Sequence, residues 1–216
     1  MIKRYFKDRA DAGNQLAQLL KYLKDQKAVI YALPRGGIVV AAPIAKTLNS
    51  PLDLIITRKI GHPNQPENAI GAVAENGHSV LNKDEILEID EAYLKEEVRV
   101  QREEARRRRE VYLGGREPIP CKDGVAILVD DGMATGLTMK AAIKELKLHY
   151  HPKKIIVAVP IIPEEMANEL ETEGTAVTTV IRSKDFSGSI GSYYQDFTPI
   201  EDQVVIEIMQ DNPGAP

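Results

Sequence analysis

The sequence has very little cysteine and no tryptophan. Its 216 residues include a single cysteine, Cys121, so no internal disulfide can form and a cysteine-based zinc site is excluded. The longest apolar runs, 38–45 and 155–163, are far shorter than the roughly 20 residues that cross a bilayer. Residues 1–13 are charged throughout and lack the apolar core of a signal peptide. These absences predict a cytoplasmic protein with no membrane partner.

Neither sign of charge dominates the chain. The 28 Lys and Arg residues are balanced by 32 Asp and Glu, for a formal charge of −4, which argues against nucleic acid as a partner. The run Arg106–Arg109 is a local exception. Successive helical residues point about 100° apart, so four arginines cannot share one face. Because Glu103, Glu104 and Glu110 also offset them, we interpret this run as a solvated helix surface.

Short β-rich segments alternate with helical patterns along most of the chain. Uninterrupted apolar runs such as 125–129 are typical of strands buried on both faces of a parallel sheet. The alternation predicts an α/β fold, a mostly parallel sheet flanked by helices, in a single domain over 1–216. Strands are expected at 28–33, 52–57, 125–129, 155–160 and 177–181, and helices at 8–24, 38–48, 137–149, 164–171 and 200–209.

Four segments depart from this alternation. Asn76-Gly77, between two short apolar runs, is a strong hairpin signal. Segment 61–68 contains two prolines, two asparagines and a glycine, which predicts a mobile loop. Segment 83–113 is expected to be a long charged helical insertion. Segment 211–216 is expected to be a frayed tail.

Two adjacent acids form the most distinctive feature of the sequence. Asp130 and Asp131 end the apolar run 125–129 and are followed by a glycine-bearing loop and the start of a helix. Backbone N–H groups of such a loop form an anion site suited to a phosphate. The two carboxylates would repel that phosphate, so we expect them to bind ribose hydroxyls or the shell of a magnesium ion. Capping the helix would need only one of them.

Two common nucleotide-binding motifs are absent from this loop. Gly132–Gly136 has the wrong spacing for a P-loop, with Leu137 at the lysine position, and no G-x-G-x-x-G is present. Segment 125–138 instead resembles the 5-phosphoribosyl pyrophosphate (PRPP) signature of the type I phosphoribosyltransferases: an apolar strand, two acids, a small loop and Thr-Gly-x-Thr. The resemblance implies the fold of that family, with a small hood lobe.

The resemblance assigns roles to the acids and to the loop. In this family the two acids bind the ribose 2′- and 3′-hydroxyls, which implies Asp130 and Asp131, and any contact of these acids with Mg²⁺ is through ribose or water rather than direct. The loop that follows would hold the 5′-phosphate through Gly132, Met133, Ala134, Thr135, Gly136 and Thr138.

Two further segments resemble the family. Leu33-Pro34-Arg35-Gly36-Gly37 is similar to its pyrophosphate loop, with Arg35 able to fork onto a phosphate and Gly36 and Gly37 letting backbone amides approach. Arg58 and Lys59 resemble the basic pair before the mobile loop. Taken alone, residues 34–37 could be an ordinary tight turn, and Arg58 and Lys59 could be ordinary exposed charges. Beside the acid pair they predict a pyrophosphate site, with Asp130, Asp131, Arg35 and Lys59 as the catalytic set.

The acceptor side of the site is less defined. Hypoxanthine/guanine enzymes have an Asp in the phosphate loop as a proposed proton acceptor. Ala134 stands there, closer to the Ala-Thr-Gly of adenine and several other phosphoribosyltransferases, so proton transfer would fall to Glu67 or Glu75. The hood is expected from 182–198 with the N-terminal segment. Its aromatic residues suit either base stacking or ordinary lobe packing: Phe186, Tyr193 and Tyr194.

The resemblance implies a Mg²⁺-dependent phosphoribosyltransferase of nucleotide metabolism and salvage, acting as a homodimer on PRPP and a nucleobase-like acceptor. The alternative is a non-catalytic regulator that binds PRPP, because the fold alone does not determine activity. Retention of Arg35 and of Arg58-Lys59 favours catalysis. The hypothesis requires Asp130 and Asp131 to face a cleft rather than be buried in salt bridges.

Overall fold

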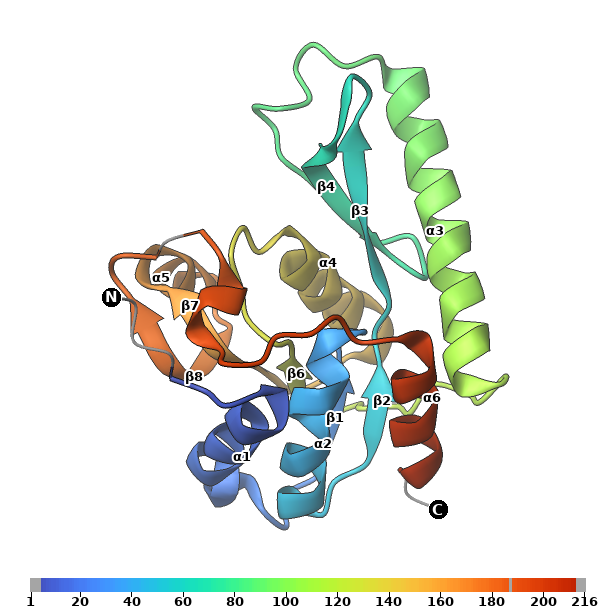
Figure 1. Ribbon diagram of the computed structural model, residues 1–216. Coiled ribbons are helices and arrows are strands. Elements are labelled where there is room, and N and C mark those ends of the chain that lie inside the picture. The colour runs from blue at the N-terminus through green and yellow to red at the C-terminus, as the bar shows by residue number, and fades with distance from the viewer. Residues whose placement is uncertain (1–4, 187, 213–216) are drawn as a thin grey trace.

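A five-stranded parallel sheet is the centre of the computed structural model, which describes residues 5–186 and 188–212 (Figure 1). Its strand order is β2-β1-β6-β7-β8, and every neighbouring pair is parallel. The predicted α/β fold is confirmed. The strands are β1 (Ala28–Ala32), β2 (Leu52–Leu54), β6 (Val125–Val129), β7 (Lys154–Pro163) and β8 (Ala176–Ser183).

Helices cover both faces of this sheet (Figure 1). Because alternate strand residues point to opposite faces, Ile30 packs in one apolar core with α1, α2 and α6, and Tyr31 in the other with α4 and α5. Short 3-10 and π-helical turns, η1 and η2, extend α1 and α4. The bounds are α1 (Arg9–Leu20), η1 (Lys21–Leu23), α2 (Gly36–Leu48), α4 (Leu137–Glu145), η2 (Leu146–Tyr150), α5 (Glu164–Thr172) and α6 (Asp202–Asp211).

A second, antiparallel sheet projects beyond the first and packs against the long helix α3 (Glu91–Leu113) (Figure 1). It consists of β3 (Thr57–His62), β4 (Gln65–Ala74) and β5 (Ser79–Leu81), in the order β3-β4-β5. The predicted hairpin at Asn76-Gly77 joins β4 to β5.

The prediction of a loop over 61–68 is wrong, because most of this segment belongs to the hairpin of β3 and β4. The pairing continues to His62 opposite Gln65, with register shifts on both sides of Gly61. A Cβ on Gly61 would lie 2.7 Å from the carbonyl oxygen of Pro66, so the glycine lets the strands close around the proline. Proline is tolerated at such irregular edge positions.

A small lobe forms where the N-terminal segment meets residues 182–198. The N–H of Tyr5 donates to the Tyr193 carbonyl at 2.9 Å, and the N–H of Gln195 donates to the Phe6 carbonyl at 2.9 Å. The lobe includes the short 3-10 helix η3 (Ile190–Tyr193). Residues 1–4, residue 187 and residues 213–216 of the predicted tail lie outside the described residues. Within the described part, no helix is long and apolar enough to cross a membrane.

Candidate active site

The acid pair lies at the carboxyl edge of the central sheet, directly against the turn after β1. Asp130 and Asp131 follow the last residue of β6. A Cβ on Gly37 would lie 3.0 Å from the Cα of Asp130, and one on Gly36 would lie 1.9 Å from Oδ2 of Asp131. The fold therefore brings two segments that are far apart in the sequence into direct contact. Gly36 and Asp131 are 95 residues apart in the chain, and Gly37 and Asp130 are 93 residues apart.

Arg9 neutralises one of the two acids. Its Nε donates to Oδ2 of Asp131 at 2.7 Å, and both side chains are largely buried. Burial raises the pKa of both acids. The charge of Asp131 raises the pKa of Asp130 further, whereas Arg9 opposes the rise at Asp131. The requirement that neither acid be buried in a salt bridge thus fails for Asp131, whose Oδ2 is bonded to Arg9. A ribose contact of Asp131 must therefore be compatible with this ion pair. Nothing in the local sequence pattern marked Arg9.

The loop after the acids is shaped by close packing on the small lobe and on β7. A Cβ on Gly132 would lie 2.5 Å from Ile190, and the N–H of Met133 donates to the Ile161 carbonyl at 3.0 Å. Met133 is buried and its N–H is engaged by Ile161, so its contact with a phosphate stays a prediction. Gly136 adopts a left-handed conformation (φ 73°) as the N-cap of α4.

The start of α4 has the properties expected of an anion site. No side chain of the N-cap residue occupies the first N–H groups of the helix. Such groups have no partner within a helix and point toward whatever lies beyond its end. Thr135 is exposed and Thr138 half-buried beside them, while Ala134 contributes no polar side-chain atom.

The turn at 34–37 contains a cis peptide bond between Pro34 and Arg35. It is closed by the N–H of Gly37, which donates to the Leu33 carbonyl at 3.1 Å. The Arg35 side chain is partly exposed and extends toward α6, with Nη1 3.6 Å from a carboxylate oxygen of Asp202. Contact of Arg35 with a pyrophosphate stays a prediction.

The basic pair on β3 is divided between two sides of the strand. Arg58 Nε donates to Oε1 of Gln101 on α3 at 3.1 Å. Burial and the nearby charge of Arg108 lower the pKa of Arg58. Lys59, the next residue along the strand, is exposed. Their binding of pyrophosphate also stays a prediction, with Lys59 the more accessible of the two.

The three aromatic residues of the lobe have different surroundings. The Tyr194 ring is buried between Phe6 and Phe197, and its hydroxyl donates to the Asp131 carbonyl at 2.6 Å. Tyr193 is buried with its ring parallel to that of Phe186, 6.0 Å between centroids. Tyr194 therefore supports the backbone of the acid pair. Stacking of any of the three on an acceptor stays a prediction.

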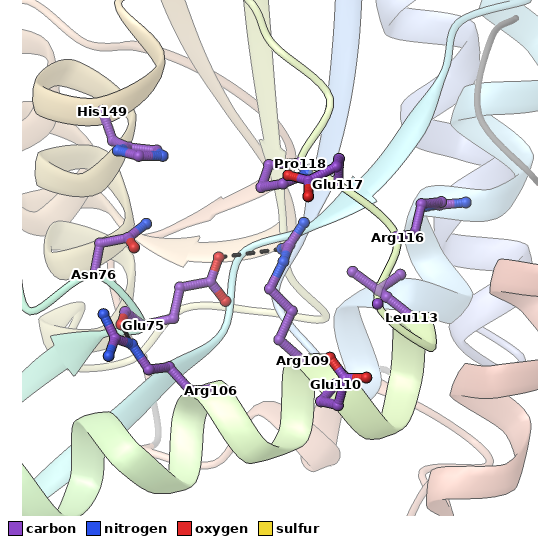
Figure 2. A pocket seen from close by; sticks show the side chains of 11 residues that line it. Glu75, Asn76, Arg106, Arg109, Glu110, Leu113, Arg116, Glu117, Pro118 and His149 are labelled. Atoms are coloured by element: carbon purple, nitrogen blue, oxygen red, sulfur yellow. Dashed lines mark hydrogen bonds and ion pairs between the residues drawn. The ribbon is translucent and has the colours of Figure 1, made fainter.

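A second group of charged side chains surrounds a cavity of about 180 Å³ between α3, the turn after β4 and η2 (Figure 2). Arg109 Nη1 lies 3.1 Å from Oε1 of Glu75, and its Nη2 lies 3.2 Å from Oδ1 of Asp53. Arg109 also donates to the Leu54 carbonyl at 2.8 Å. These charges pair with one another, so we interpret the group as a brace that holds α3 and the β4–β5 turn against β2.

The interpretation of Arg106–Arg109 as a solvated surface is therefore wrong for Arg109, whose side chain is largely buried in the brace. Arg106 is exposed, although its Nε donates to the Glu75 carbonyl at 3.0 Å. Arg107 and Arg108 pair with Glu104 on the helix surface. As expected, the four arginines do not share one face of α3.

Glu75 belongs to this brace. Its Oε2 has no hydrogen-bond partner among the described residues, and burial raises the pKa of its carboxyl group to about 7. The same turn is tied to α4, because Asn76 and His78 bind Glu145 at 2.6 and 2.7 Å. Of the two residues suggested for proton transfer, Glu75 is thus engaged by Arg109 and Glu67 is exposed on the hairpin.

Replacing Glu75 with glutamine should change how stability depends on pH. Because the folded carboxyl has a pKa of about 7 and the unfolded one an ordinary value of 4.5, the folded protein binds the extra proton between these values. The free energy of unfolding should therefore fall as pH rises through that window, by about 3 kcal/mol.

In the Glu75→Gln protein the side chain at this position cannot titrate. Its free energy of unfolding minus that of the wild type should therefore rise by this amount between pH 4.5 and pH 8. Urea unfolding at a series of pH values measures this difference. The matched control is Glu117→Gln, an exposed residue at the rim of the same cavity, whose curve should run parallel to the wild type. A parallel Glu75→Gln curve would contradict the assignment.

Adding one methyl group at Gly36 should damage the acid pair. The new Cβ would lie 1.9 Å from Asp131 Oδ2 and 3.0 Å from Arg9 Nε, and the ion pair prevents the carboxylate from moving aside easily. Although alanine is favoured over glycine in a helix, Gly36→Ala should lower the free energy of unfolding by about 1–3 kcal/mol. Thermal and urea unfolding measure this. A variant more stable than the wild type would show that Asp131 is not held in this position.

Comparison with known proteins places the chain in a family. A family model for the phosphoribosyl transferase domain matches residues 6–197. A Mycobacterium tuberculosis H37Rv protein named "Putative phosphoribosyl transferase Rv0571c" is 39% identical over 206 residues, covering 94% of this chain and 46% of that protein. The chain thus spans about half the length of the curated relatives it matches. It belongs to the phosphoribosyl transferase family.

A solved structure supports the same placement. The crystal structure of TT1426 from Thermus thermophilus is 37% identical and superposes with a TM-score of 0.81, covering 96% of this chain and 99% of that one. The recognition of a type I phosphoribosyltransferase from segment 125–138 is confirmed by the family match.

Proposed function

We propose that this protein transfers the 5-phosphoribosyl group of PRPP to a nitrogen of a nucleobase-like acceptor and releases pyrophosphate. The observation that carries the proposal is the contact between the acid pair and the turn 34–37, where Gly36 and Gly37 leave no space for a side chain. A ribose bound by Asp130 and Asp131 would therefore lie beside the backbone proposed to hold its pyrophosphate. Family membership supports PRPP as the substrate.

The proposed reaction forms a bond from the acceptor nitrogen to the anomeric carbon and inverts that carbon. The C–O bond to pyrophosphate breaks, its electron pair leaves with pyrophosphate, and the acceptor nitrogen loses its proton. Positive charge builds on the ribose ring, and Asp130 and Asp131 would face this charge while accepting hydrogen bonds from the ring hydroxyls. Arg35 and Lys59 would neutralise the leaving group. Catalysis would rest on positioning and electrostatics.

The 5′-phosphate would bind where the loop 132–136 meets α4. The uncapped N-terminus of this helix supports that assignment, because its N–H groups and dipole both favour an anion. The hydroxyls of Thr135 and Thr138 would add donors. The hairpin around 61–68 would close over the bound substrates and exclude water, which otherwise hydrolyses PRPP.

Mg²⁺ fits this site as an ion bound by the substrate rather than by the protein alone. Across residues 5–186 and 188–212, no group of three or more His, Cys, Asp or Glu side chains could hold a metal. The oxygen ligands that Mg²⁺ prefers would come from PRPP and water, and Asp130 and Asp131 would contact the ion only through the ribose or through bound water. When bound, Mg²⁺ would neutralise charge on the departing pyrophosphate.

The direct test is release of pyrophosphate from PRPP with a panel of purines, pyrimidines and their analogues, with and without Mg²⁺. We expect Mg²⁺-dependent release with at least one base, and Ala134 favours acceptors other than 6-oxopurines. Tight PRPP binding without release for any base would support the alternative, a non-catalytic PRPP-binding regulator. Absence of both binding and release would reject the proposal.

A further inference from the structure

Arg9 connects the acid pair to the small lobe. It lies 122 residues before Asp131 in the chain and is 7% exposed. Its Nε donates to Oδ2 of Asp131 at 2.7 Å, and its Nη1 donates to the Thr198 carbonyl at 2.9 Å. The guanidinium carbon lies 3.8 Å from the ring centroid of Phe197. One planar group thus contacts an acid, a backbone carbonyl and an aromatic ring.

The lobe also holds the backbone of the same acid. The Tyr194 hydroxyl donates to the Asp131 carbonyl at 2.6 Å, and the Tyr194 ring packs against Phe197 with 4.8 Å between centroids. Asp131 is therefore fixed at its side chain through Arg9 and at its carbonyl through Tyr194. Both contacts lead to the segment 182–198.

The acid pair needs a cation close by. Asp130 and Asp131 are neighbours in the chain and both lie in a mostly buried setting, where like charges repel strongly. The groups that face Asp131 are Asp130 from the end of β6, Arg9 from α1 and the phenol of Tyr194 from the lobe. Of these only Arg9 carries a positive charge. A lysine could supply the positive charge. It lacks the planar guanidinium group, which here donates hydrogen bonds in two directions and stacks on the Phe197 ring.

We infer that Arg9 is a positioning residue of this site, which holds the Asp131 carboxylate ionised and oriented toward the ribose and couples it to the lobe 182–198. The inference rests on the proposed function, because it assigns Arg9 a role in binding PRPP. It implies that the lobe expected to cover the acceptor also sets the geometry of the sugar site.

The test is calorimetric titration of each protein with PRPP and Mg²⁺ between pH 6 and 9. Arg9→Gln should weaken PRPP binding about tenfold or more at neutral pH, because Asp131 loses the charged hydrogen bond that keeps its carboxylate ionised and oriented. Since Asp131 then takes up a proton more readily, the pH at which binding is half-maximal should move upward. Arg9→Lys should keep the wild-type pH midpoint with an intermediate affinity.

A second variant leaves the ion pair in place. Phe197→Leu removes the ring beneath the guanidinium, which also packs against Tyr194, and should weaken PRPP binding about threefold as the cation–π contact is lost. The matched control is Arg107→Gln, an exposed arginine paired with Glu104 on α3, which should bind PRPP as the wild type does. In a protein that already carries Asp131→Asn, Arg9→Gln should add little further loss.

The outcomes separate this inference from the proposed function. If the wild type does not bind PRPP, the proposed function fails. If the wild type binds PRPP, and folded Arg9→Gln or Arg9→Lys protein binds it with unchanged affinity and an unchanged pH midpoint, the role of Arg9 is refuted. A loss of affinity in Arg9→Gln with no shift of the pH midpoint would show a structural role and would also overturn the inference.

Discussion

The double variant Asp130→Asn plus Asp131→Asn should abolish PRPP binding, with a loss of at least about a hundredfold in affinity. Two charge-assisted hydrogen bonds to the ribose are replaced by weaker neutral ones, at about 1.5–3 kcal/mol for each bond to a charged group. The change also leaves Arg9 buried without its carboxylate partner. Calorimetry with PRPP and Mg²⁺ measures the loss directly.

The control for this experiment is Asp123→Asn, the same substitution at an exposed turn before β6. Asp123 has a left-handed backbone (φ 60°), which asparagine also tolerates, so folding and PRPP binding should both be retained. Unchanged affinity in the double variant would reject the assignment of the acid pair to the ribose, and with it the proposed geometry of the site.

Removing Arg109 should destabilise the whole fold rather than the site alone. Arg109→Met leaves Asp53, whose side chain is fully buried, and Glu75 without their close cation, and it leaves the Leu54 carbonyl without a donor. Arg116 lies 3.9 Å from Asp53 and compensates only in part. Breaking a buried pair by removing one partner costs about 3–5 kcal/mol, so we expect a loss of that size in urea unfolding at neutral pH.

Part of this loss should return when the uncompensated charge is removed. Glu75→Gln in the Arg109→Met protein should recover stability, since a neutral amide tolerates burial better than an unpaired carboxylate. The matched control is Arg107→Met on the same helix, where the exposed pair with Glu104 contributes less than about 1 kcal/mol. If Arg109→Met stays within about 1 kcal/mol of the wild type, Arg109 does not brace the fold as described.

The acid pair was predictable because its signals are local. An apolar run that ends in two acids and a glycine loop indicates a buried strand, its carboxyl end and a phosphate-binding turn without any knowledge of distant residues. Gly36 and Gly37 could be singled out for the same reason, although the sequence did not show that they contact Asp131 and Asp130.

Arg9 and Arg109 were not predictable from local signals. Both are arginines on helices, and arginine side chains are ordinarily solvated. Arg9 pairs with Asp131, which lies 122 residues further along the chain. Arg109 pairs with Asp53, which lies 56 residues before it. Whether an arginine is exposed or buried in an ion pair depends on which distant carboxylate the fold brings to it.

Local patterns were enough to establish the alternation of strands and helices and the position of the acids, since period, turn residues and apolar runs act over a few neighbouring residues. Only the folded chain shows that 61–68 pairs as a hairpin, that α3 has a buried charged side, and that the small lobe holds Asp131. These features arise from contacts between segments far apart in the chain, and a sequence pattern over a few neighbouring residues does not predict such contacts.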